Sequence, residues 1–147
     1  MNLVAPIIEP VISILGFGWG IGALVLGEVS GITYLSFAGA GLLAITVLMR
    51  AMFETTYAAY FRMVYQSTYD AILATPVDAE SLALAEILWA ITHGAFDTVI
   101  IMGVLVAFGA ATSWWAVLAP VPLIFGAMFM AGLSLGVTAH VLSLIHI

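Results

Sequence analysis

Three side chains that can exchange protons follow one another at helical spacing in the second half of the sequence. Glu86, His93 and Asp97 are seven and four residues apart, so on an α-helix they form one stripe. Such a stripe suits a hydrogen-bond network between membrane helices, a polar transport path, or proton or metal chemistry. One helix supplies at most two good metal ligands, and the sequence has no second cluster. We therefore predict no metal site and interpret the stripe as an interhelical network, with a transport path as the alternative.

A second polar stripe precedes the first. Arg50, Glu54 and Tyr57 are four and three residues apart and share one face of a helix. A Glu–Arg pair at this spacing neutralises most of its own charge, which apolar surroundings require. We interpret these residues as a structural ion pair near a membrane interface. The alternatives are a polar lining for a transported head group and a latch between two copies of the chain.

Motifs for catalysis are missing from the sequence. It has no glycine-rich loop followed by lysine, no nucleophile elbow and no loop with paired aspartates. Without cysteine, the chain has neither disulfides nor thiolate metal ligands. Two arginines and no lysine accompany eight acidic residues, so no basic surface for nucleic acid exists. We predict no catalytic residue, no cofactor in this chain and no nucleic-acid partner.

The elements that carry these polar residues are too apolar for water. Of 147 residues, 65% are hydrophobic and 7% charged, whereas a soluble domain carries about 25% charged residues. Lipid must therefore cover much of the exterior. Because about 20 apolar residues cross the hydrocarbon core, the sequence predicts four membrane spans, at about 7–26, 34–61, 82–108 and 114–142. In the first span Gly16, Gly18, Gly20 and Gly22 suit a close approach of another helix.

The longest polar stretch, residues 63–81, separates the second and third spans. Ile72 and Leu73 follow Tyr69 at helical spacing, which predicts a short amphipathic helix at the membrane interface. The third helix is predicted to begin in the segment Thr75-Pro76-Val77-Asp78. Thr75 would be its cap, Pro76 its first residue and Asp78 the partner in a capping box.

Charge and aromatic residues indicate the orientation in the membrane. Both arginines lie near the 63–81 stretch, and the turns at 27–33 and 109–113 carry none. The positive-inside rule therefore places this stretch and both termini in the cytoplasm. Trp114 and Trp115 are predicted to be interfacial anchors of the fourth span, and Pro120 and Pro122 to kink it.

Several segments resemble one known family, and together they extend over nearly the whole chain. The most specific is residues 69–77, because it stands between two spans. The others are Glu9-Pro10, the glycine-rich run 16–22, residues 53–57, Glu86 and Trp89-Ala90. With these residues the sequence resembles the type-2 ABC exporter permeases, and within them most closely the nodulation-factor (lipo-oligosaccharide) export permeases.

The resemblance implies an all-α polytopic membrane bundle in the bacterial inner membrane, with four of the six transmembrane helices of a permease domain in residues 1–142. It implies a cytoplasmic N-terminus, a second permease copy as homodimer partner and surrounding membrane lipid. It also implies a coupling helix between spans two and three that docks onto a cytoplasmic ABC ATPase subunit, where ATP and Mg²⁺ are bound. That role falls on Tyr69, Asp70, Ala71, Ile72, Leu73, Thr75 and Pro76.

The sequence departs from the family pattern at both ends. The basic segment before the first span and spans five and six are missing, and residues 143–147 do not resemble the family's continuation. We therefore expect a fragment of a transport subunit with a foreign tail at 143–147. The resemblance implies ATP-driven export of a lipid-linked oligosaccharide or similar amphiphile. A membrane-embedded lipid-modifying enzyme and a proton-driven secondary transporter are the alternatives.

Overall fold

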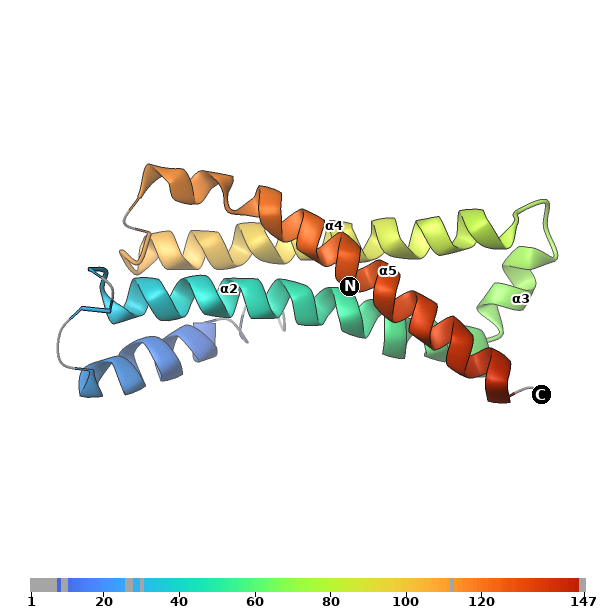
Figure 1. The fold of residues 1–147 in the computed structure, drawn as a ribbon, viewed down its shortest axis with the longest axis horizontal. Helices are drawn as coiled ribbons and strands as arrows, with labels where there is room; N and C mark the ends of the chain where they lie inside the picture. The colour runs from blue at the N-terminus through green and yellow to red at the C-terminus, as the bar shows by residue number, and fades with distance from the viewer. Residues whose placement is uncertain (1–7, 9–10, 26–27, 30, 112, 146–147) are drawn as a thin grey trace. The chain divides into compact units, whose positions relative to one another are not determined.

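The computed structural model describes residues 8, 11–25, 28–29, 31–111 and 113–145. Within these residues the regular secondary structure consists of helices (Figure 1). The predicted boundaries of the first span at residues 7 and 26, the Glu9-Pro10 pair and the last two residues of the predicted tail lie outside the described residues. In chain order the helices are η1 (Ile14–Ile21), η2 (Gly22–Leu24), α2 (Tyr34–Phe53), η3 (Glu54–Ala58), η4 (Phe61–Tyr65), α3 (Thr68–Leu73), α4 (Ala79–Ala107), η5 (Trp114–Leu118) and α5 (Pro120–Ile145).

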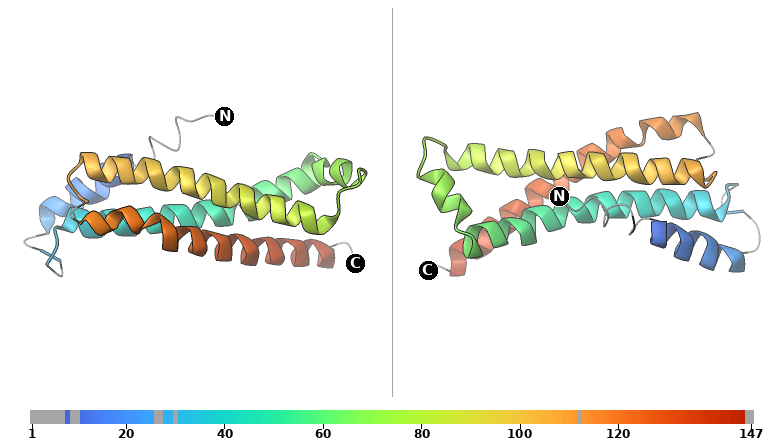
Figure 2. Two further views of the ribbon diagram at one scale, coloured as in Figure 1. Left: turned by 90° about the horizontal axis from the view of Figure 1, so that it is seen from above. Right: turned by 180° about the vertical axis from the view of Figure 1, so that it is seen from behind.

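Three helical runs of the described chain are long and apolar enough to cross a membrane. They are Tyr34–Tyr65, Ala79–Ala107 and Trp114–Leu142, and Val11–Leu24 is a shorter apolar helix. The short helix α3 stands between the first two of these runs, next to the beginning of α4 (Figure 2). The predicted all-α membrane helix bundle is confirmed, with a short helix between the second and third predicted spans. Those two spans and the fourth correspond to the three long runs, whereas the first corresponds to the shorter helix Val11–Leu24.

The chain forms two compact units. The first contains the chain up to Val47 together with Ala95–Leu123, and the second contains Leu48–Gly94 together with the chain from Ile124 onward. The helices α2, α4 and α5 each contribute to both units. The polar residues around α3 all belong to the second unit.

Packing in the first unit depends on two glycines. A side-chain carbon at Gly18 would collide with Leu35, and one at Gly39 would collide with Leu105. Of the four glycines predicted to allow close approach, Gly18 is therefore one that does so. A carbon at Gly16, by contrast, would meet no atom within 4 Å. Helix contact thus uses one side of the glycine run rather than all of it.

The ends of α4 show how its sequence sets its length. Asp78 is the cap, because its carboxylate accepts a hydrogen bond from the backbone N–H of Ser81 at 2.7 Å. Hydrogen bonding from the Ser81 side chain, and then from its backbone N–H, lowers the pKa of Asp78. At the other end, Gly109 has a positive φ of 69°. The backbone N–H groups of Gly109 and Ala110 donate to the carbonyls of Val106 and Leu105, which closes the helix with a Schellman motif.

Two predictions about helix ends were wrong. Thr75 does not cap α4: its hydroxyl donates to the Ile72 carbonyl at 2.6 Å and so closes the end of α3. As a result α4 begins three residues later than Pro76, at Ala79. The prolines of the last span do not kink a continuous α-helix. Instead the 3₁₀ turn η5 ends at Leu118 and α5 begins at Pro120, where a missing backbone N–H costs nothing.

The glycine packing predicts different effects for two similar substitutions. Gly18→Ala should lower the free energy of unfolding by about 1 kcal/mol relative to Gly16→Ala, because the new methyl group overlaps the end of the half-buried Leu35 side chain, which must turn aside. Gly16→Ala is the matched control, and a small gain in stability is expected because alanine favours a helix. Unfolding of the two purified variants in mixed micelles measures this difference. Equal stability would contradict the close contact.

Candidate functional site

The helix that follows α2 is wider than an α-helix, and this geometry sets the direction of its polar side chains. Residues 54–58 and 61–65 form the π-helical turns η3 and η4, in which each turn holds more residues than in an α-helix. Eight residues separate Glu54 from Arg62, and the widened turns bring both side chains to the same side of the helix. π-helical turns are frequent at functional sites.

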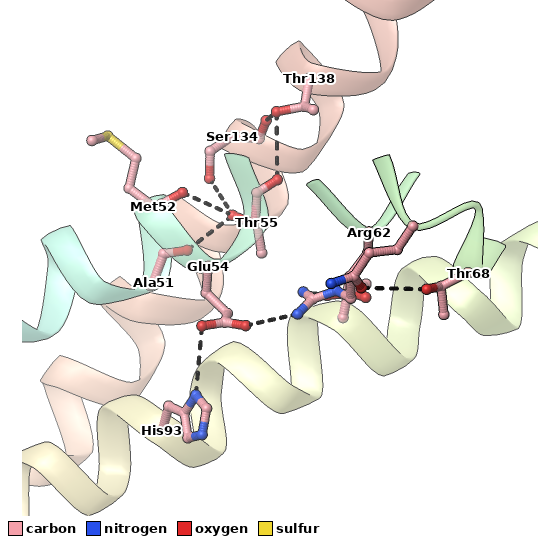
Figure 3. A network of polar contacts seen from close by, with 11 residues as sticks. Ala51, Met52, Glu54, Thr55, Arg62, Thr68, His93, Ser134 and Thr138 are labelled. Atoms are coloured by element: carbon pink, nitrogen blue, oxygen red, sulfur yellow. Dashed lines mark hydrogen bonds and ion pairs between the residues drawn. The ribbon is translucent and has the colours of Figure 1, made fainter. Parts of the chain in front are cut away.

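Four ionisable side chains meet in the second unit, and we call them the Arg62 cluster: Glu54, Arg62, Glu86 and His93. The Arg62 guanidinium contacts Glu54 through Nη1 at 3.2 Å and Glu86 through Nη2 at 2.5 Å. The second oxygen of Glu54 lies 3.6 Å from His93 Nδ1 (Figure 3). Both carboxylates are largely buried, with side-chain exposures of 14% for Glu54 and 10% for Glu86. One arginine therefore joins its own helix to α4.

The Arg62 cluster is built for charge neutralisation. Two carboxylates face one guanidinium, and the His93 imidazole lies beside one of them. Trp89 packs on the imidazole, with ring centroids 4.3 Å apart. Among the described residues, no group of three or more His, Cys, Asp or Glu could hold a metal ion. The chemistry that this arrangement supports is electrostatic pairing between two helices.

Tyr69 of α3 lies against this cluster. Its side chain is 6% exposed, and its hydroxyl has no hydrogen bond of good geometry to any described residue. The same holds for Arg62 Nε. Burial raises the pKa of the Tyr69 phenol to about 12, and the nearby Glu86 carboxylate adds to the rise while Arg62 opposes it. The phenol is therefore a neutral, buried contact of α3 with the cluster.

A row of hydroxyl groups joins the same helix to α5. Thr55 Oγ1 lies 2.6 Å from Ser134 Oγ (Figure 3). The Thr138 hydroxyl donates to the Ser134 carbonyl of its own helix at 2.8 Å and also lies 3.4 Å from the Thr55 carbonyl. Thr55 and Ser134 are buried. Hydroxyl pairs of this kind hold membrane helices together, because no water competes for the bond.

The structure brings together only some of the predicted polar residues. Glu54, Glu86 and His93 meet, whereas Tyr57 is 69% exposed and lines an apolar groove of about 430 Å³ instead. The π turn at 54–58 explains this, because it rotates Tyr57 away from the face that Glu54 occupies. Asp97 is buried one turn beyond His93 on α4, in the first unit, and Arg50 is half-buried on α2.

The predicted coupling residues differ in burial. Tyr69 is buried and Ile72 is half-buried, whereas the other predicted residues are exposed. The exposed ones are Asp70, Ala71, Leu73, Thr75 and Pro76.

Sequence reasoning missed the central residue, Arg62, and the three hydroxyls. Arg62 was used only to orient the chain. The signal that could have found it is the shortage of positive charge, because a chain with two arginines and eight acidic residues must use each arginine as a partner. The hydroxyl row gives no such signal, because serine and threonine are common in membrane helices.

The hydroxyl row predicts a difference between two adjacent threonines. Thr55→Val should lower the free energy of unfolding by about 0.6–1.7 kcal/mol, because the bond to Ser134 is lost. Thr56→Val is the control, since the hydroxyl of Thr56 donates to the Met52 carbonyl of its own helix. We expect little change for it. Unfolding in mixed micelles compares the two, and a larger loss for Thr56→Val would contradict the interhelical bond.

The environment of Tyr69 predicts an alkaline transition. Because the pKa of the folded phenol is about 12 and that of an unfolded tyrosine is about 10, the neutral phenol favours the folded state. This contribution is fully present below pH 10 and disappears as the pH rises towards 12. Phenolate absorbance of the micelle-bound protein should show a late transition that Tyr69→Phe removes. A late transition that persists in Tyr69→Phe would show that it does not come from Tyr69.

Curated proteins similar to this chain share one name. Nodulation protein J of Bradyrhizobium diazoefficiens is 33% identical over 143 residues, which cover 93% of this chain and 54% of the relative. Nodulation protein J of Rhizobium leguminosarum bv. trifolii is 37% identical and that of Sinorhizobium fredii 35% identical, each over 94% of this chain and 52% of the relative. The chain thus spans about half the length of the curated relatives it matches. No family model and no solved structure matches it. The chain is therefore a homologue of the Nodulation protein J sequences over nearly all of its length, which confirms its resemblance to the nodulation-factor export permeases.

Proposed function

We propose that this chain is the membrane-spanning permease part of an ATP-driven exporter, and that α3 is the helix through which a separate ATPase subunit acts. The observation that carries the proposal is the construction of α3. It is a short helix between two candidate spans, buried on one side and exposed on the other. The relatives named Nodulation protein J support this assignment.

The exposed side of α3 suits a docking contact. Leu73 is 43% exposed and Val77, in the turn that follows, is 40% exposed. Asp70 adds a negative charge on the same exposed surface. A compact helix with an apolar tip and one charge is the type of element that seats in a groove of a partner protein. Tyr69, which is buried one turn before Leu73, holds the helix to the membrane part.

ATP hydrolysis belongs to the partner in this proposal. The sequence offers no phosphate-binding loop, so ATP and Mg²⁺ would bind the ATPase subunit. The cargo would be a lipid-linked oligosaccharide or a similar amphiphile, moved out of the cytoplasm. A second permease copy would complete the path, within the lipid of the bacterial inner membrane, with α3 and the N-terminus on the cytoplasmic side. The Arg62 cluster and the predicted residues Arg50, Tyr57 and Asp97 would line a polar path through the membrane or form polar contacts between its helices.

A crosslinking experiment tests the docking role of α3. The chain has no cysteine, so Leu73→Cys introduces a single reactive thiol without removing others. We expect this variant to form an adduct with an ATPase subunit that is encoded beside it and coexpressed with it. ATP should change the yield of the adduct, because nucleotide closes the ATPase and moves the docked helix.

Leu24→Cys is the matched control. Leu24 is also an exposed apolar residue, at 81% exposure, but it lies in the first unit, at the end of η2. It should give no adduct. Equal adducts from both positions, or none from Leu73→Cys, would refute docking through α3. Transport that continues without ATP but stops when the proton gradient is removed would favour the secondary transporter instead.

A further inference from the structure

Arg62 occupies the point where three helical segments meet. The first is its own run, in which Arg62 of η4 contacts Glu54 of the preceding η3. The second is α4, where its other terminal nitrogen reaches Glu86. Only about a quarter of its side chain is exposed. Lysine could not replace these contacts, because its single ammonium does not offer two separated nitrogens in one plane. Each of the two terminal guanidinium nitrogens therefore contacts a different carboxylate.

The third segment is α3. Its residue Tyr69 is buried next to Arg62 and Glu86, both of which influence the phenol. Neither the hydroxyl of Tyr69 nor Nε of Arg62 makes a hydrogen bond of good geometry to a described residue, although the phenol interacts with both Arg62 and Glu86. Contact between α3 and the cluster thus rests mainly on the buried ring.

The connection before α3 is short. Only Gln66 and Ser67 separate η4 from α3, and Ser67 has a positive φ of 50°, which is uncommon for a residue with a side chain. The Ser67 carbonyl accepts from the backbone N–H of Ala71, so the turn is part of the helix start. A movement of α3 is therefore transmitted directly to η4, which contains Arg62.

We infer that Arg62 is the positioning residue of α3: by binding Glu54 and Glu86 at once, it fixes the ends of two spans to each other and forms the surface on which Tyr69 seats the short helix. The mechanical meaning of this inference rests on the proposed function, because a docked ATPase would move α3 and the cluster would pass that movement to both spans together. The inference about positioning itself concerns this chain alone.

The position of α3 can be measured without any partner. A nitroxide attached to the single thiol of Leu73→Cys reports the mobility of α3 in the purified chain in micelles. We expect high mobility when Arg62→Gln or Tyr69→Ala is added, because the seat of the helix is lost. Tyr69→Phe should leave the label nearly as immobile as in the parent, since the ring stays buried and the hydroxyl makes no bond of good geometry. Arg62→Lys should restore only part of the order.

Arg50→Gln is the matched control for loss of an arginine. Arg50 lies on α2, three turns before Arg62, and its removal should not change the mobility at position 73. If Arg62→Gln fails to fold, Glu86→Gln carries the same test, because it keeps the shape of the side chain and removes the charge that Arg62 binds. Unchanged mobility in both Tyr69→Ala and the folded charge variant would overturn the inference.

A second measurement connects positioning with transport. In liposomes with the ATPase subunit, Arg62→Gln should still allow the crosslink from position 73. Cargo moved per ATP hydrolysed should fall about fivefold or more, the lower range of allosteric couplings, and Arg62→Lys should recover part of it. A crosslink with unchanged transport per ATP would refute the positioning role but keep the proposed function. Absence of the crosslink in the parent, with a mobile label in Arg62→Gln, would refute the proposed function and keep the positioning role.

Discussion

The cost of placing charge in a lipid-covered helix is the constraint on which the rest of this structure depends. A charged side chain in apolar surroundings is tolerated when a partner of opposite sign neutralises it. This chain has only two arginines. One of them, Arg62, forms ion pairs with two buried carboxylates that come from different helices. These ion pairs join two helices. They therefore also fix the position of α4 relative to the helical run Tyr34–Tyr65 within the second unit.

The π-helical turns make this pairing possible. An α-helix repeats every 3.6 residues, so residues eight apart drift away from a common face, and wider turns correct that drift for Glu54 and Arg62. The change of helix type disturbs the hydrogen bonds of nearby carbonyls. Thr55 and Thr56 lie at this point, and their hydroxyls donate to the carbonyls of Ala51 and Met52. The two threonines therefore satisfy the backbone where the helix widens, and Thr55 also reaches α5.

Much of the fold followed from composition and spacing, because a lipid environment permits few solutions. Long apolar runs must be helices, and a polar stretch with apolar residues at helical spacing gave the short helix α3. The site followed less well. Tyr57 was grouped with Glu54 on the assumption of a regular α-helix, and the π turn separates them. Thr75 fits a cap by type, but Asp78 competes for the same role with a stronger, charged acceptor. Such competitions are decided by local geometry, which residue types alone do not reveal.

The two sides of α3 give the second unit an asymmetry. Asp70 and Ala71 are exposed, as is Leu73 at the end of the helix, whereas Tyr69 is buried and touches a cluster whose members belong to both neighbouring runs. Packed side chains transmit displacement because they have few alternative arrangements. A force on the exposed side would therefore reach the Arg62 cluster through the buried Tyr69. Ion pairs suit this position better than apolar contacts, because apolar side chains slide past one another at little cost, whereas separating Arg62 from Glu86 leaves a buried charge without its partner.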